Sequence, residues 1–361
     1  MQPKKAQRSW QHLIGILALA VVVCLYVWAS SQPRDHVFGG ETMGTTYTVK
    51  IARATLTKRE LKTLQDEIKD LLGSVNSHMS MYDTDSDVSR FNKTRETEFV
   101  AVSDDTAAVT GFALEIARLT GGAFDPTVMP LVSLWGFGPD GSPGTVPSLA
   151  DVKSCLENVG YANVAVGEPA SLAKSLPGVT LDLNAIAKGY AVDRIATRLV
   201  ANGYPNVFVE VGGEVAAMGA PTQHERWRIA IDSPKKDSLP GEQVMQIVNL
   251  RDECIATSGD YRSFFEDQGR TYSHLLDPRT GYPVSNGVAS ATVIAHDCMT
   301  ADALATALMV LGPCAGIDVI ENYHGAKALL ILHSPGGRFT QVVSAGFRRH
   351  IEASRESALV K

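Results

Sequence analysis

The sequence predicts an α+β fold with largely antiparallel sheets and packed helices. Its strand-like segments come in runs instead of alternating strictly with helices, and short turns separate several of them as in hairpins. Hydrophobic residues make up 45% of the 361-residue chain and charged residues 20%, which is ample material for a sizeable core. No linker-like stretch divides residues 32–361, so we expect them to form a single domain.

Residues 1–31 have the features of an export signal. Basic residues precede an uncharged run from Leu13 to Ala29. The length of this run falls between a signal-peptide core and the roughly 20 residues that span a bilayer, so a cleaved signal and an uncleaved anchor both remain open. Cys24 raises a lipoprotein as a third possibility, but Val23 stands where lipidation needs a small residue. In each case the rest of the chain lies on the outer, periplasmic side of the cytoplasmic membrane.

Charge and missing motifs exclude several classes of protein. The net charge is −6, from 33 basic and 39 acidic residues, which argues against a nucleic-acid partner. The sequence contains no GxGxxG that opens a helix, no GxxxxGK[ST], no HExxH and no GxSxG. Dinucleotide-binding dehydrogenases, P-loop enzymes, zincins and serine hydrolases are therefore disfavoured.

Four cysteines follow the export segment: Cys155, Cys254, Cys298 and Cys314. None forms a CxxC pair, so a thiolate metal site is not indicated. An exported chain permits disulfides, but the spacing alone cannot select a pairing.

The first half of the chain is expected to open with a strand and a helix. The strand alternates apolar and polar residues, and the helix has apolar residues at helical spacing. The expected elements are a strand at 45–51, a helix at 56–76, an Asp- and Ser-rich loop at 79–92, a helix at 104–120 capped by Asp104 or Asp105, and a Gly- and Pro-rich loop at 135–149. The last of these loops is long enough to close over a site.

The second half is expected to contain most of the strands. A short strand, 179–184, feeds a helix that starts at Ala185. Further strands are expected at 206–211, 227–234, 242–250, 290–295 and 327–333, and late helices at 301–311 and 314–322.

The junction LDLNAIAKG is a candidate anion site. Asn184 is a good N-cap residue, and Lys188 adds positive charge within the first turn of the helix that follows. Asp182, at the end of the strand, could bind a polar group of a ligand. The simpler interpretation, a capped helix with a solvated lysine and a solvent-facing aspartate, stays open.

The late helix MTADALATALMVLG carries an isolated carboxylate. Asp302 and Thr306 are four residues apart and share one face of a helix that is apolar on almost every side. A buried carboxylate needs a cation, which is either a Lys or Arg side chain or a metal ion. Carboxylate, hydroxyl and carbonyl oxygens suit Mg²⁺ or Ca²⁺. The residue types alone leave the ion pair and the metal site equally open.

Three turns carry further polar residues. GGAFDP places Phe124 and Asp125 directly after a helix stop, SHLLDPRTG pairs His274 with a turn, and ATSGDYR surrounds Gly259 with hydroxyl and acidic side chains. Asp, Pro and Gly are common turn formers, so turn chemistry explains each segment by itself. His274 could act as a general base or serve as a structural histidine.

Taken in order, eight such segments closely resemble the ApbE family of FAD:protein FMN transferases. They span Gly40 to Gly312 and are GETMGTTYTVKI, MYDTDSDVSRFN, GGAFDPTVMPLVSLWGFG, LDLNAIAKGYAVD, VEVGGEV, ATSGDYR, SHLLDPRTGYPV and TADALATALMVLG. The resemblance implies a T-fold-like α+β domain. It also implies an exported enzyme that cleaves FAD with Mg²⁺, transfers FMN to a Thr or Ser hydroxyl of a partner protein, and releases AMP.

The resemblance also implies roles for individual residues. The metal ligands would be Asp302, Thr306 and the backbone carbonyl of Ala185. The flavin nucleotide would contact the residues that match the family motifs: Met43, Tyr82, Ala123, Phe124, Asp125, Asp182, Lys188 and the backbone near Leu276. Met43 and Tyr82 would flank the flavin ring, although an apolar core role explains either one equally well.

The implied chemistry is phosphoryl transfer by positioning and electrostatics. Lys188 would assist charge neutralisation, and Asp302, His274 or another group would deprotonate the acceptor. Subunits of membrane redox pumps are candidate acceptors by resemblance. Two alternatives stay open: an FAD pyrophosphatase that releases free FMN and AMP, and a periplasmic flavin-binding protein without turnover.

Overall fold

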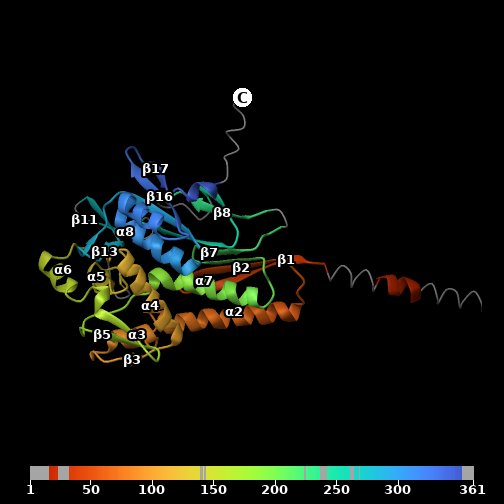
Figure 1. The fold of residues 1–361 in the computed structure, drawn as a ribbon, viewed down its shortest axis with the longest axis horizontal. Coiled ribbons are helices and arrows are strands. Elements are labelled where there is room, and N and C mark those ends of the chain that lie inside the picture. The colour runs from red at the N-terminus through yellow and green to blue at the C-terminus, as the bar shows by residue number, and fades with distance from the viewer. Residues whose placement is uncertain are drawn as a thin grey trace, which may run out of the picture.

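The computed structural model describes residues 16–22, 32–138, 141, 144–222, 225–235, 242–260, 264–267 and 269–351. It confirms the α+β fold, because one eight-stranded sheet with antiparallel pairing throughout dominates the molecule (Figure 1). The strands lie in the order β1 (Arg34–Thr42), β2 (Thr45–Ala54), β6 (Val207–Val211), β7 (Glu214–Met218), β10 (Glu253–Gly259), β15 (Val288–Ala295), β16 (Lys327–Ser334) and β17 (Arg338–Val343).

Helices cover one face of this sheet. α7 (Asn184–Ala201) packs on β6 and β7, and α8 (Cys298–Asn322) packs on β10 and β15. α2 (Lys58–Met79) lies against the outer side of α7 (Figure 1). Alternate strand residues such as Val209 and Val293 point into this layer and are fully buried, as the two-residue period of a strand requires.

The opposite face of the sheet is covered by the hairpin of β8 (Trp227–Asp232) and β9 (Val244–Leu250). The intervening strand residues, such as Ile255 and Ile294, point to this side and pack with Trp227. The middle of the sheet is therefore covered on both faces, which explains why every residue of β15 is buried.

The remaining elements are short and, apart from η2, which packs beside the β8–β9 hairpin, lie mostly around the end of the helical layer where α7 begins. They are α3 (Asp87–Lys93), β3 (Val100–Ala101), α4 (Asp104–Leu119), α5 (Met129–Leu134), α6 (Leu149–Leu156), η1 (Tyr161–Asn163), β4 (Val164–Gly167), β5 (Ser171–Lys174), β11 (Phe264–Asp267), β12 (Arg270–Ser273), β13 (Leu276–Asp277), β14 (Tyr282–Pro283) and η2 (Phe347–Arg349). Trp135 ties two of these segments together, since its indole N–H donates to the Gly281 carbonyl at 2.9 Å.

Several local predictions are wrong. Residues 256–259, expected in a turn, form the end of strand β10. The expected loop at 79–92 contains most of α3, because Ser86 caps a helix there by accepting the Ser89 N–H. Residues 179–183 form no strand, because the Asn92 side chain, not a neighbouring strand, binds the backbone N–H and carbonyl of Leu181. α4 is capped by Ser103, and not by either aspartate that follows it.

The late helices are confirmed as two helical segments of α8. Gly312, with φ 78°, and Pro313 interrupt the helix at the predicted break. Within the part of the chain that the structure describes, α8 is the only helix long and apolar enough to cross a membrane, and 56% of its most apolar window is buried inside the protein. Its apolar character is therefore explained by its place in the core.

The predicted export segment, residues 1–31, falls largely outside the described residues. Only 16–22 are described there, as an exposed helical stretch. The division into an export segment and a single domain stays a prediction.

Candidate functional site

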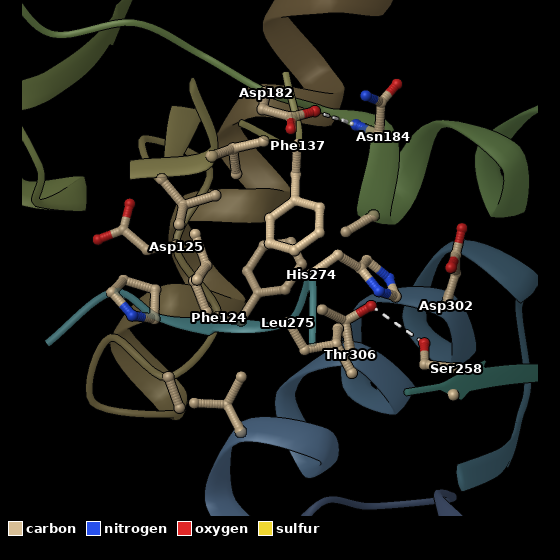
Figure 2. A pocket seen from close by; sticks show the side chains of 18 of the residues that line it. Phe124, Asp125, Phe137, Asp182, Asn184, Ser258, His274, Leu275, Asp302 and Thr306 are labelled. Atoms are coloured by element: carbon tan, nitrogen blue, oxygen red, sulfur yellow. Dashed lines mark hydrogen bonds between the residues drawn. The ribbon is translucent and has the colours of Figure 1, made fainter. Parts of the chain in front are cut away.

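A cavity of about 350 Å³ opens where the start of α7 meets the second and third turns of α8. Strand ends β7 and β10, the loop after α4 and the loop before β13 complete its wall. All the predicted site residues except Met43 and Tyr82 line it. Figure 2 shows Asp302, Thr306 and Ser258 on one side of the cavity, Asp182 and Asn184 on another, and the rings of Phe137 and His274 between them.

Asp302 is the buried carboxylate that the sequence singled out, and it is 2% exposed. Its Oδ2 accepts the backbone N–H of Gly189 in α7 at 3.0 Å and lies 3.9 Å from the Lys188 ammonium. Thr306, one turn later, has its hydroxyl 3.2 Å from that of Ser258 on β10 (Figure 2). The junction at the start of α7 and the late helix therefore meet in space.

Lys188 lies between two buried carboxylates. Its ammonium is 3.3 Å from Glu214 Oε1 as well as 3.9 Å from Asp302 Oδ2. Glu214 follows the Gly212-Gly213 turn, and a Cβ on Gly212 would come within 3.2 Å of the Lys188 side chain. Both glycines have positive φ, so this turn brings β7 close to the lysine at little conformational cost.

The start of α7 differs from the prediction. Asn184 is the first residue of the helix and not its N-cap, and its backbone N–H donates to Asp182 Oδ1 at 2.8 Å. A side chain does accept an N–H group at the start of α7, as predicted, but it is the Asp182 carboxylate and not the Asn184 side chain. Desolvation by the surrounding protein raises the pKa of Asp182, while the Asn184 N–H and the charge of Lys188 lower it.

The loop after α4 brings Ala123, Phe124 and Asp125 to the cavity. Burial raises the pKa of Asp125, although the hydroxyl and N–H of Thr127 and the N–H of Tyr161 oppose this. These groups donate to its two oxygens at 2.6, 2.8 and 2.8 Å. Asp125 therefore organises its own loop as well as lining the cavity.

His274 and Leu276 line the cavity from the segment around β13. His274 is partly buried, and its ring lies edge-on to Phe137 with 6.3 Å between the ring centres. Phe137 in turn packs against Phe265. The histidine is thus held on an aromatic wall that faces the α8 carboxylate (Figure 2).

Met43 and Tyr82 do not line this cavity. Met43 occupies the β1–β2 turn with φ 48° and packs partly against the main core, while Tyr82 is 67% exposed. Their predicted contact with a flavin ring stays a prediction.

Sequence reasoning gave no individual site role to several residues of the cavity wall. Glu214 and Phe137 were parts of the motifs VEVGGEV and GGAFDPTVMPLVSLWGFG but received no role, and Ser258 was noted only as a hydroxyl of the ATSGDYR segment. The only available signal for Glu214 was a charge directly after a Gly-Gly turn. Its partner lies 26 residues away in another element, so the spacing could not reveal the pair.

The donor set fits a hard metal ion. A buried carboxylate, a hydroxyl and a helix-start carbonyl, from Asp302, Thr306 and Ala185, line one cavity, and such oxygen ligands suit Mg²⁺. Among the described residues, no three His, Cys, Asp or Glu side chains cluster in a way that could hold a metal ion. A metal bound here would therefore depend on hydroxyl, carbonyl and substrate oxygens in addition to one carboxylate.

Comparison with known proteins finds one family model and several relatives that match most of this chain. Residues 43–330 match the model of the ApbE family. The FAD:protein FMN transferase of Vibrio cholerae is 41% identical over 94% of this chain and 98% of its own length. The Haemophilus influenzae protein of the same name is 38% identical over 94% of this chain and 97% of its own length.

Solved structures agree with these sequence matches. The flavin transferase ApbE from Vibrio cholerae superposes with a TM-score of 0.78 at 41% identity, and the match covers 88% of this chain and 99% of that one. The apo flavinyl transferase ApbE from Pseudomonas stutzeri gives a TM-score of 0.80 at 36% identity, covering 90% and 98%.

Proposed function

This chain belongs to the ApbE family, and we propose that it transfers the FMN moiety of FAD, with Mg²⁺, to a Thr or Ser hydroxyl of an exported protein, releasing AMP. The relatives reported above are named FAD:protein FMN transferases, so the chain is a transferase. Flavin transfer follows from the family. Magnesium, the acceptor and the released AMP are our proposal for this chain.

The observation that carries the proposal is the meeting of α7 and α8. Asp302, Thr306 and Ala185 line the same cavity as Lys188. Asp302 also accepts a hydrogen bond from the backbone N–H of Gly189 in α7. Flavin binding alone needs no hard-metal site, whereas cleavage of a pyrophosphate benefits from one. This favours an enzyme over a binding protein.

In the proposed reaction, the acceptor hydroxyl oxygen forms a bond to the phosphorus of the FMN half of FAD. The bond from that phosphorus to the oxygen bridging to AMP breaks, and AMP leaves with this oxygen. Mg²⁺ bound by Asp302, Thr306 and the Ala185 carbonyl would neutralise charge on the pyrophosphate. Lys188 contributes a fixed positive charge beside it, held in place by Glu214. His274, on the aromatic wall, is our candidate to accept the hydroxyl proton on a ring nitrogen.

Asp302→Ala in the full-length chain provides the test. With FAD, Mg²⁺ and an exported redox-pump subunit as acceptor, we expect the wild type to produce a fluorescent protein band that survives denaturing electrophoresis. The alanine variant should lose the band, with a fall in rate of at least about 10³-fold, because it lacks the only carboxylate of the metal site. Fluorescence imaging of the gel measures the product.

The same reaction distinguishes the alternatives. Free FMN and AMP without a labelled acceptor would show a pyrophosphatase, and unchanged FAD would contradict both enzymatic proposals. Asp297→Asn, at the N-cap of α8 outside the cavity, is the matched carboxylate control and should retain the band.

We also propose that the enzyme works on the periplasmic side of the cytoplasmic membrane, held there or sent there by residues 1–31. The sequence pattern of that segment supports the proposal. Membrane fractionation of cells that express the full chain, with protease added from the outside, would measure the location.

A further inference from the structure

The contact between α7 and α8 contains a second carboxylate, Asp193, outside the cavity. Its Oδ1 accepts the backbone N–H of Cys298 at 2.7 Å, and its Oδ2 accepts that of Met299 at 2.8 Å. Both N–H groups belong to the first turn of α8, where a helix provides no internal partners for them. The local N-cap, Asp297, already accepts the Thr300 N–H. Asp193 thus adds a cap that comes from a different helix.

One face of α7 makes these contacts. Ala185, Gly189 and Asp193 are spaced four residues apart and therefore follow one another along the same side of the helix. Gly189 donates its N–H to Asp302, and a Cβ at this position would lie 2.4 Å from the Cys298 carbonyl oxygen. The two helices are in backbone contact here, and Asp193 fixes the end of that contact.

On the basis of the function proposed above, we propose that Asp193 is a positioning residue for the metal-binding turns of α8. Its carboxylate fixes the first turn of α8 against α7, and the backbone of α8 carries this placement to Asp302, one turn later, and to Thr306. These two groups are thereby set against Ala185 and Lys188. Placement matters here because Mg²⁺ requires a nearly ideal octahedral arrangement of ligands.

The carboxylate is chemically well suited to this role. Two N–H groups need two acceptor oxygens, and an amide of the same shape would offer one oxygen and one competing N–H₂ donor. Desolvation raises the pKa of Asp193 to about 7, against the lowering effect of the Cys298 and Met299 N–H groups. The fold therefore keeps a costly group where a neutral side chain would be easier to bury.

The test compares Mg²⁺ binding by Asp193→Asn and by the wild type, in the full-length chain with saturating FAD and no acceptor. Calorimetric titration should show the Mg²⁺ dissociation constant raised by roughly 10-fold or more, the range seen when outer partners of metal ligands are changed. Hydrogen exchange at the start of α8 should become faster. Asp297→Asn is the matched control: it makes the same carboxylate-to-amide change at the same end of α8, its side-chain oxygen can still accept the Thr300 N–H, and it leaves the contact with α7 intact, so its Mg²⁺ affinity should stay within about twofold of the wild type.

Asp193→Glu keeps both oxygens but moves them by one methylene group, so it should fold and raise the dissociation constant by about threefold or more. If the asparagine variant does not fold, an unchanged affinity in the glutamate variant overturns the proposal. If Asp193→Asn folds and binds Mg²⁺ as tightly as the wild type, the positioning role is also overturned. The proposed function would still stand in that case, provided that the wild type transfers flavin. Weaker Mg²⁺ binding without any flavin transfer by the wild type would support the positioning role and contradict the transferase proposal.

Discussion

At the scale of single residues, one cation lies between two buried carboxylates where α7 meets α8. Lys188 is 24% exposed at its side chain, whereas Glu214 and Asp302 are each 3% exposed. The lysine therefore partly neutralises both acids. In the proposed reaction the lysine would also compete with a metal ion for Asp302, because its ammonium lies 3.9 Å from Oδ2 of that carboxylate.

Lys188→Ala should separate these two effects. We expect the rate of flavin transfer to fall by at least about 10-fold, because a positive charge beside the pyrophosphate is lost. Mg²⁺ affinity should stay the same or increase, because the ammonium no longer competes for Asp302. Steady-state rates and calorimetric Mg²⁺ titration measure the two quantities. Lys62→Ala, on the exposed surface of α2, is the control and should change neither. A collapse of Mg²⁺ affinity in Lys188→Ala would instead show that the lysine holds Asp302 in place.

At the scale of elements, the close approach of α7 and α8 depends on Gly189. This glycine is buried in the middle of a helix, where glycine is intrinsically unfavourable. The structure gives the reason, since the Cys298 carbonyl occupies the space that a side chain would need. Glycine lowers the intrinsic stability of α7 at this position. Its missing side chain lets the α7 backbone lie against the Cys298 carbonyl of α8, where the Gly189 N–H donates to Asp302.

Gly189→Ala should force the two helices apart. We expect the free energy of unfolding to fall by about 2 kcal/mol or more and the Mg²⁺ affinity to fall with it. Chemical denaturation and calorimetry measure these changes. The control is Gly73→Ala in α2, where a Cβ would meet nothing within 4 Å. That variant should be stabilised by about 0.5–1 kcal/mol. A stabilised Gly189→Ala would contradict the tight contact.

At the scale of the whole molecule, an ionic cluster joins the sheet to the C-terminal segment. Glu253 on β10 lies 2.6 Å from the Lys327 ammonium on β16 and 2.8 Å from His350 Nε2, just after η2. Burial by itself raises the pKa of Glu253, but the hydrogen bonds and charges of His350 and Lys327 outweigh it and lower the pKa to about 2. The cluster links residues that are 97 positions apart in the chain.

Glu253→Gln should therefore reduce stability in a pH-dependent way. A carboxyl group whose pKa is lowered on folding stabilises the protein above its ordinary pKa of 4.5, and this contribution is lost as the pH falls toward 2. We expect the variant to be less stable by about 2–3 kcal/mol at pH 7, with the difference from wild type shrinking between pH 4.5 and pH 2. Thermal unfolding at several pH values measures it. Asp66→Asn, in an exposed ion pair, should show almost no difference.

Much of the fold was predictable from local patterns. Apolar patterns located four strands of the main sheet, β2, β6, β15 and β16, as well as α8, but not β1, β7, β10 or β17. The break at Gly312 and Pro313 was visible as a helix-ending pair. Local patterns failed where a side chain from elsewhere decided the outcome. Asn92 holds the segment before α7 out of a strand, and Ser86 turns an expected loop into a helix.

The sequence by itself determined the family, the residue types of the site and the anomaly of Asp302, because an isolated carboxylate in an apolar helix is visible in any local window. Only the tertiary structure decided what the carboxylate meets. Gly189 lies 113 positions before Asp302, Asp193 lies more than 100 before the start of α8, and Glu214 reaches Lys188 from a different element. Such contacts depend on how the helices pack on the sheet. No local preference encodes that packing, since it results from the burial of the whole core.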